Sequence, residues 1–340
     1  MKSRLFVVAA GVLAASFTLT AQTRPAGPKT PKASYTPPKT PWGDPDLQGN
    51  WPAQFNIPMQ RAGNLKDKEV LSDEEFAQAE TQAQQQSANV QKQYANQITI
   101  NPPLYWSEGG RRTKQTSVVV DPPDGKVPPL TPQAQKIIAS ERGGQHFPDK
   151  LDSWEDFDYY SRCITRGFPS TMLYTVYNYG NDIIQAPGYV VIRSEMVHEQ
   201  RIIPIDNRKH VGKDIKMYMG NSIGHWEGNT LVVETTNLRP ESGAGGRYTG
   251  AAKIVERFTR TAPDELMWEA TISDPNVWTR PYTLRYPFKM DREYHLYEYA
   301  CHEGNYMMLD SLTAARQLEA QGLDTKVVRG EAGGPLPGTR

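Results

Sequence analysis

The chain has 340 residues, and its 38 Lys and Arg residues are balanced by 38 Asp and Glu, so the formal net charge is zero. A balanced chain lacks the positive field that attracts phosphate backbones, which excludes nucleic acid as an expected partner. The 27 glycines, 27 prolines and 17 tyrosines favour strands joined by turns.

Residues 1–21 have the pattern of a secretory signal peptide. Lys2 and Arg4 precede an apolar run, and Ala21 is a small residue at the expected cleavage position. A membrane-spanning helix needs ~20 apolar residues, and this run is shorter, so cleavage near Ala21 is predicted over an uncleaved anchor. We therefore expect a periplasmic or secreted mature protein without a membrane span.

A main domain is predicted after an N-terminal tether and extension, and a short C-terminal segment is predicted to follow it. Residues 22–44 are rich in Pro, Lys and Thr and are predicted to form a disordered tether. Residues 45–150 are predicted to be an extension that packs on the main domain, with helices over about 71–94 and 131–142. The first helix opens with a capping-box pattern and the second with Thr-Pro. A short helix and a disordered tail are predicted for 311–340.

The main domain is predicted to be all-β and to span 151–310. Short connections such as Glu227-Gly228-Asn229 predict sequential antiparallel hairpins. Closing about eight strands into an up-and-down barrel removes exposed edges, and such a barrel has room for one small ligand. The predicted strands include 175–179, 189–198 and 294–301.

The last predicted strand carries one of the two cysteines. Alternation along 294–301 places Tyr297, Tyr299 and Cys301 on one face. In an oxidising compartment, Cys163 and Cys301 are predicted to form a disulfide. Two buried free thiols are the alternative.

A candidate catalytic group follows that strand. His302 can act as a general base, Glu303 can orient its ring, and Tyr299 can donate a proton. Neighbouring residues on a strand point in opposite directions, so His302 and Glu303 meet only if the chain turns at Gly304. The alternative is a strand end that is held by side-chain hydrogen bonds.

A second candidate group combines an arginine with tyrosines and an asparagine, which suit stacking of a ring and anchoring of a carboxylate or hydroxyl. Tyr and Asn are also common at turns, so both interpretations stay open. If the face of the strand that carries His198 points inward, His198 is expected at the rim of the barrel; if the opposite face points inward, Arg193 and Glu195 are expected to be buried and paired. The predicted ligand-binding residues are Arg166, Tyr174, Asn178, Tyr179, His198 and Tyr306.

No metal or cofactor is predicted. The six histidines show neither HxH nor HExxH spacing, and a metal site would have to combine distant residues such as His198, His225 and Glu227. The glycines at 243–246 lack the Lys-Ser/Thr of a phosphate-binding loop. A G-x-S-x-G nucleophile motif is absent as well.

Several segments together resemble an uncharacterised family of secreted bacterial all-β proteins. The segments are PDLQGNW, VVVDPPDGKVPPLTPQAQ, GYVVIRSEMVHEQRIIPID, GHWEGNTLVVETTN and YEYACHEGNY, between about Pro45 and Tyr306. The resemblance implies an exported all-β protein and transfers no catalytic residues. Gly49-x-Trp51 also resembles the opening of the first lipocalin strand, which implies a lipocalin-like or calycin-like barrel with an N-terminal helical extension.

These observations favour an exported barrel that binds a small apolar, aromatic or sugar-acid-like molecule. One alternative is a cofactor-independent lyase, isomerase or hydrolase that uses a His-Glu-Tyr-Arg group, so whether the chain is an enzyme stays open. The other alternative is a structural protein of the envelope, which a solidly packed interior would favour. The sequence predicts no oligomeric state.

Overall fold

The computed structural model describes residues 35–66, 68–96, 108–140, 151–240 and 248–323. All of them belong to the second of the two units into which the chain divides, residues 33–340. The predicted signal peptide, most of the predicted tether and the end of the predicted tail lie outside the described residues. Within the described part, no helix is long and apolar enough to cross a membrane.

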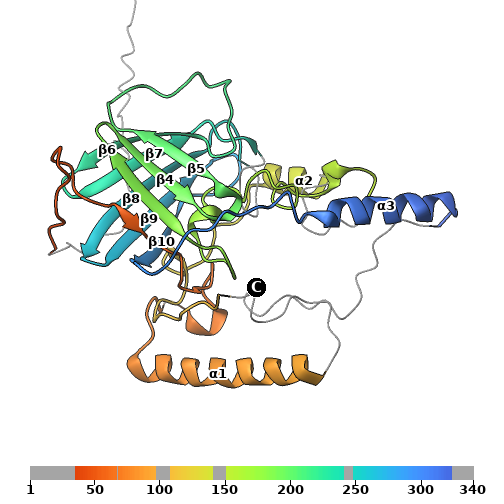
Figure 1. The fold of residues 1–340 in the computed structure, drawn as a ribbon. Coiled ribbons are helices and arrows are strands. Elements are labelled where there is room, and N and C mark those ends of the chain that lie inside the picture. The colour runs from red at the N-terminus through yellow and green to blue at the C-terminus, as the bar shows by residue number, and fades with distance from the viewer. Residues whose placement is uncertain (1–34, 67, 97–107, 141–150, 241–247, 324–340) are drawn as a thin grey trace, which may run out of the picture. The chain divides into compact units, whose positions relative to one another are not determined.

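The strands of the described residues form two antiparallel sheets, as Figure 1 shows. The four-stranded sheet has the order β1 (Gly49–Asn50), β3 (Asn181–Ala186), β4 (Tyr189–Ser194) and β5 (Gln200–Pro204). The six-stranded sheet has the order β2 (Val119–Asp121), β10 (Tyr282–Lys289), β9 (Glu265–Ser273), β8 (Lys253–Ala262), β7 (Thr230–Thr236) and β6 (Asn221–Glu227). The all-β prediction is confirmed.

Consecutive strands pair within each sheet, which confirms the predicted antiparallel hairpins. Strands β6 to β10 form one meander and β3 to β5 another. In the β6–β7 hairpin, Glu227 pairs with Thr230, and Gly228 turns the chain with a φ of 61°, a conformation that favours glycine. Strand β6 was not predicted, because only the turn that follows it was recognised in the sequence.

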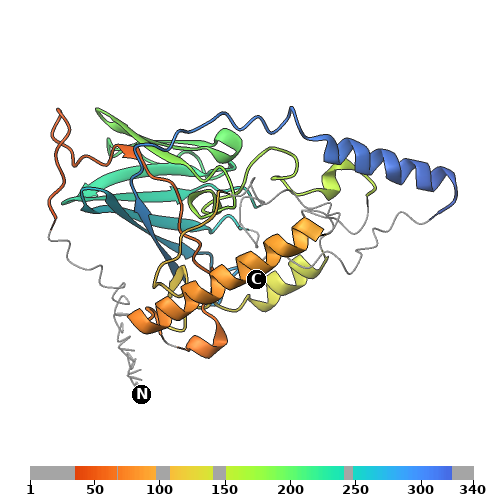
Figure 2. The ribbon, with the colours of Figure 1, turned by 60° about the horizontal axis from the view of Figure 1, so that its bottom comes forward.

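The hydrophobic core lies between the two sheets, which overlie each other in Figures 1 and 2. Ile192 and Ile203 come from the four-stranded sheet, and Phe258 and Trp268 from the six-stranded sheet. Trp51 of the Gly49-x-Trp51 motif is 1 % exposed in the same core. Among the described strands, none of one sheet pairs with a strand of the other, so a closed lipocalin-like barrel is not found.

A buried ion pair connects the two sheets. Arg201 of β5 and Glu256 of β8 are 2 % and 0 % exposed, and Arg201 Nη1 donates to Glu256 Oε1 at 3.0 Å. Trp268 Nε1 donates to the same carboxylate oxygen at 2.9 Å. The Arg201 guanidinium also lies 4.2 Å from the centre of the Phe168 ring. These side chains occupy part of the interior where the barrel prediction expected a ligand.

Three α-helices accompany the sheets. They are α1 (Asp73–Asn96), α2 (Pro132–Ser140) and α3 (Tyr306–Ala320), and the short 3₁₀ helices are η1 (Gly63–Leu65), η3 (Trp154–Asp156), η4 (Ser170–Met172) and η5 (Met196–His198). The two predicted N-terminal helices are confirmed. Ala315 of α3 packs against Leu151 and Phe157 in a small second core, and this helix begins earlier than predicted.

Two predicted strands are wrong and a third is too long. Residues 294–301 belong to an irregular segment, Asp291–Asn305, which we call the strap, and 175–179 also form no strand. Alternation alone does not make a strand, because a strand also needs a neighbour to complete its hydrogen bonds. The predicted strand 189–198 ends at Ser194, where η5 begins the turn to β5.

Candidate functional site

Three segments that are distant in sequence meet beside β4. They are the loop 158–180, the β4–β5 turn 195–199 and the strap. The hydrogen bonds and the disulfide described below connect each of these segments to at least one other. Most of the predicted site residues lie on them.

A surface cleft of ≈ 350 Å³ lies where the β4–β5 turn faces the strap. This volume is near the lower end of the range that small-molecule pockets occupy. One wall offers a guanidinium, an imidazole and an amide, and the strap offers a phenol ring and a carboxylate. The lining residues are Arg193, Ser194, Glu195, His198, Gln200, Leu296, Tyr297 and Glu298.

The buried carboxylate of Glu195 holds the strap against β4. It accepts from the Tyr294 hydroxyl at 2.7 Å and from Tyr297 N at 3.0 Å on the strap. It also accepts from Asn178 Nδ2 at 2.9 Å and Gly180 N at 3.2 Å. Charge-assisted hydrogen bonds of this kind are the stronger class, so Glu195 fixes the position of the cleft's second wall.

The local backbone positions Glu195 for this role. Glu195 N donates to Gly180 O at 2.9 Å, and a Cβ at Gly180 would lie 2.7 Å from both Glu195 Oε2 and the Tyr294 ring. Only glycine therefore allows the three residues to approach so closely. Val197 and His198 have φ values of 59° and 39°, which turn the chain away from the strand and present the exposed His198 to the cleft.

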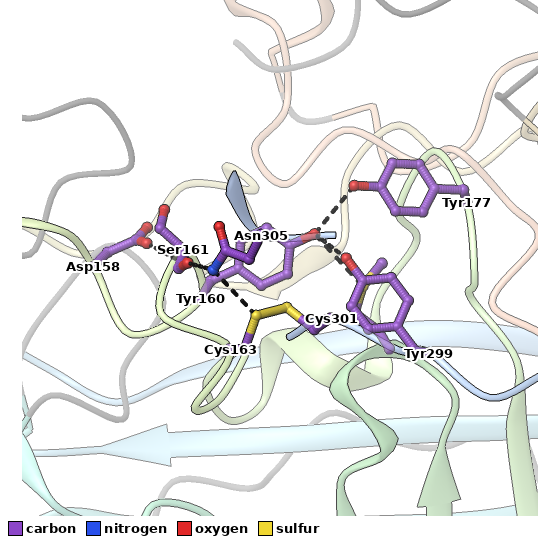
Figure 3. The surroundings of a disulfide bond; sticks show 9 residues. Asp158, Tyr160, Ser161, Cys163, Tyr177, Tyr299, Cys301 and Asn305 are labelled. Atoms are coloured by element: carbon purple, nitrogen blue, oxygen red, sulfur yellow. Dashed lines mark hydrogen bonds between the residues drawn. A yellow bond between two sulfur atoms is a disulfide. The ribbon is translucent and has the colours of Figure 1, made fainter. Parts of the chain in front are cut away.

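The hydroxyls of three tyrosines, one of them Tyr299 of the strap, converge in a phenol cluster, as Figure 3 shows. The hydroxyl of Tyr160 lies 3.3 Å from those of Tyr177 and Tyr299, and it also approaches Met196 Sδ at 3.5 Å. The rings of Tyr177 and Tyr299 are nearly parallel, with centres 6.4 Å apart. Burial and the neighbouring phenols raise the pKa of Tyr160, and burial raises that of Tyr299. Both hydroxyls therefore stay protonated near neutral pH.

The disulfide Cys163–Cys301 fixes Tyr299 within this phenol cluster. Its two Cα atoms are 5.7 Å apart across a sequence separation of 138 residues, and the prediction of this bond is confirmed. Asn305 adds a second connection, because its Nδ2 donates to Ser161 O at 2.7 Å and approaches Cys163 Sγ at 3.4 Å (Figure 3). Disulfides persist in oxidising compartments, which is consistent with a periplasmic or extracellular protein.

Arg166 interacts electrostatically with the phenols and with Glu199. Burial lowers the pKa of the Arg166 guanidinium, while its interactions with Tyr160, Tyr177 and Glu199 oppose this effect. Glu199 accepts from Arg166 N at 3.2 Å and from the Thr165 hydroxyl. Burial raises the pKa of the Glu199 carboxyl.

Three further tyrosine rings pack in a row, and the last of them, Tyr294, donates to the Glu195 carboxylate. The Tyr179 ring centre is 5.8 Å from that of Tyr174 and 5.6 Å from that of Tyr294. Burial raises the pKa of Tyr179 to about 12, and burial together with the Glu195 hydrogen bond raises that of Tyr294. Tyr294 is also a residue of the strap, so the row of rings packs against the strap.

The structure brings several predicted site residues into this region. Tyr299 lies in the phenol cluster, where the charge of Arg166 acts on it. Asn178 donates to Glu195, and His198 lines the cleft. Tyr174 and Tyr179 lie in the adjacent ring group.

Other predicted residues are not brought together. His302 and Glu303 are exposed in the turn that follows Cys301, and Tyr306, at the start of α3, is 65 % exposed. The predicted catalytic group of His302, Glu303 and Tyr299 is therefore not assembled in this structure. The disulfide joins the loop 158–180 to the strap. There Tyr299 of the strap contacts Tyr160 of the loop.

The expected pair of Arg193 and Glu195 is wrong. Arg193 Nη2 instead donates to Asp182 Oδ2 at 3.1 Å on β3, because the two residues face each other in the β3–β4 register. Glu195 lies past the end of the strand and turns inward. Strand alternation placed the two side chains on one face, and it does not hold beyond Ser194.

The described residues contain no group of three or more His, Cys, Asp and Glu side chains that could hold a metal ion. His225 and Glu227 do point the same way, with Nε2 and Oε1 3.3 Å apart. Both are about half exposed, and Arg257 also pairs with Glu227. The pair is the end of an ordinary hairpin.

Sequence reasoning missed three contributors to the site. Tyr160 and Tyr294 were not selected, and Glu195 was expected in a different role. The one available signal was the position of Glu195 directly after the apolar strand β4. A carboxylate that is buried at such a position requires several hydrogen-bond donors. The tyrosines carry no comparable signal, since their partners come from distant segments.

No model of a known protein family matches the sequence, and a search of curated proteins finds no match. The resemblance to a secreted bacterial family therefore stays a prediction.

Proposed function

We propose that this protein is an exported binding protein for a small, hydroxyl-rich ring compound such as a sugar acid. The observation that carries the proposal is the cleft of ≈ 350 Å³ between the β4–β5 turn and the strap. Its walls combine hydrogen-bond donors and acceptors with the ring of Tyr297, which is 70 % exposed. A polar ring with several hydroxyls can use both kinds of group.

The lining favours this ligand over a purely apolar one. Arg193, His198 and Gln200 supply donors on one wall, and Glu298 supplies an acceptor on the other. An apolar molecule would displace water from these groups without replacing its hydrogen bonds, which costs binding energy. The proposal includes export of the chain. It does not depend on a lipocalin-like closure of the sheets, because binding in the surface cleft requires neither a hollow barrel nor a cofactor.

Isothermal titration of the disulfide-bonded mature chain with galacturonate and glucose tests the proposal. We expect galacturonate to bind, and we expect Arg193→Gln to weaken binding by about ten-fold through loss of a charge-assisted hydrogen bond. Arg280→Gln is the matched control, because Arg280 also pairs with an aspartate at 3.1 Å but on the other sheet. Failure of both sugars to bind, or equal affinity in the Arg193 variant, would overturn the proposal.

A cofactor-independent lyase, isomerase or hydrolase is the second candidate. It is favoured by the placement of Tyr299 among three phenols beside a guanidinium, a group that can donate a proton to a developing anion. Turnover of a sugar acid that is lost in Tyr299→Phe, with binding retained, would favour the enzyme. A structural envelope protein, which the filled core favours, is the expectation if neither binding nor turnover is observed.

A further inference from the structure

The outer face of the four-stranded sheet carries an exposed apolar row. Ile184 of β3 pairs with Val191 of β4, which in turn pairs with Ile202 of β5. Ile184 and Ile202 are 43 % and 64 % exposed, whereas their neighbours Ile183 and Ile203 are buried in the core between the sheets. These strands therefore present aliphatic side chains to both faces of the sheet.

The two sheets differ in their outer faces. Antiparallel strands with one solvated face alternate apolar and polar residues, whereas near-continuous apolar runs are typical of a sheet that is covered on both sides. The six-stranded sheet is closer to the first pattern, because its outer face carries ion pairs between strands, which are Lys253–Glu234, Arg257–Glu227 and Arg285–Glu269. The apolar row on the four-stranded sheet is the exception, and a contiguous exposed apolar surface of this kind indicates an interaction surface.

Both ends of the apolar row carry an arginine that is paired with an aspartate. At one end, Arg193 Nη2 donates to Asp182 Oδ2 at 3.1 Å. At the other end, Arg208 Nη2 donates to the Tyr189 hydroxyl at 2.9 Å, and the guanidinium also pairs with Asp206. The charges at the two ends cancel, so this surface favours neither a strongly acidic nor a strongly basic partner, and it suits a partner whose charges are mixed in the same way.

We propose that this face is the interface of a two-fold symmetric dimer with a second copy of the chain. Arg193 and Tyr189 lie two residues from Val191 in opposite directions along β4, so a two-fold axis that lies in the face and crosses β4 at Val191 exchanges the two ends. The apolar row of one copy then covers that of the other, and each end with its arginine and aspartate meets the opposite end of the partner. Two-fold dimers are the commonest homo-oligomers. The inference does not rest on the proposed function, because the apolar row does not line the cleft.

Sedimentation velocity of the disulfide-bonded mature chain over a range of concentrations tests the proposal. Three short strands give a small interface, which is typical of weak association, so we expect a reversible dimer with a Kd of about 10–100 µM. Ile202→Lys is expected to raise this Kd by at least about ten-fold, because it brings an unpaired charge into the apolar contact. Leu309→Lys is the matched control, because Leu309 is also 64 % exposed but lies on α3, and it should dimerise like the wild type.

Chemical cross-linking tests the arrangement of the two copies. Val191 lies on the proposed axis, and packed sheets are about 10 Å apart, so a bismaleimide of that reach should join two copies of Val191→Cys. Val255→Cys is the matched control on the outer face of β8 and should not be joined. Near-ultraviolet circular dichroism checks the fold of each variant, and the cross-link decides the case if Ile202→Lys does not fold. A wild type that stays monomeric well above the expected Kd, an Ile202 variant that dimerises like the wild type, or equal cross-linking at positions 191 and 255 would overturn the proposal.

Discussion

Glu195 shows how much of the site depends on a single side chain. Glu195 is 2 % exposed. Its carboxylate accepts hydrogen bonds from two strap residues and from two residues that precede β3. A buried carboxylate without these donors would be unfavourable. The position of the strap therefore depends on this carboxylate.

We expect Glu195→Gln to destabilise the protein by about 1.5–3 kcal/mol, because a neutral amide accepts more weakly and brings an NH₂ group to a site filled with donors. The strap should then open locally, and trypsin should cut faster after Arg292. Urea unfolding and mass spectrometry of the digest measure the two effects. Glu298→Gln, on the exposed side of the strap, should change neither, and a Glu195 variant with wild-type stability would contradict the role assigned to this carboxylate.

Single residues of the site were predictable only in part. Asn178 and Tyr174 were found because they lie in a short segment that is unusually rich in Tyr and Asn. The role of Glu195 was not, because the left-handed backbone at Val197 and His198 leaves no trace in a sequence that otherwise alternates like a strand. A β-branched residue with a positive φ is rare, so no local pattern predicts it.

At the scale of elements, helices were predicted better than the strap. The capping box of α1 forms as expected, with Ser72 N donating to Glu75 Oε2 at 2.9 Å and Glu75 N donating to Ser72 Oγ at 3.2 Å, because both partners are close in sequence. The strap has the alternation of a strand but no neighbouring strand. Its partners are side chains from distant segments and one disulfide, which local periodicity does not contain.

We expect replacement of Cys163 and Cys301 by serine to destabilise the protein by about 2–5 kcal/mol, since the bond closes a long loop. Tyr299 should then leave the phenol cluster, and the near-ultraviolet circular dichroism of the tyrosines should weaken together with stability. Thermal unfolding and near-ultraviolet spectra of the double variant measure both effects. Reductant should reproduce the result in the wild type and have no effect on the double variant; a reduced chain with an unchanged tyrosine spectrum would show that the bond does not position Tyr299.

At the scale of the whole molecule, hairpin order was predictable and sheet closure was not. Short connections such as 187–188, 228–229 and 263–264 fix which strands are neighbours, so most of both meanders follows from the sequence. Whether the sheets close into a barrel depends on how their edge strands lie, β5 relative to β6 and β1 relative to β2. These relations involve residues that are far apart in the sequence. The Arg201–Glu256 pair between the sheets belongs to the same non-local class.

We expect Arg201→Met and Glu256→Leu to cost about 3–5 kcal/mol each, because each leaves one buried charge without its partner. The double variant should be much less destabilised than the sum of the two, since it removes both charges together. Urea unfolding of the four proteins in a double-mutant cycle measures the coupling. Additive effects would contradict a direct contribution of this pair to the contact between the sheets.

The strap lies after all the strands in the chain, although it forms one wall of the cleft. A polypeptide that emerges from the ribosome or a translocation channel with its N-terminus first completes both sheets before this wall exists. A prematurely terminated product that stops before residue 291 therefore keeps every strand and lacks the cleft and one phenol. The proposed binding cleft is therefore completed only with the last stretch of biosynthesis, after the segments that form the two sheets.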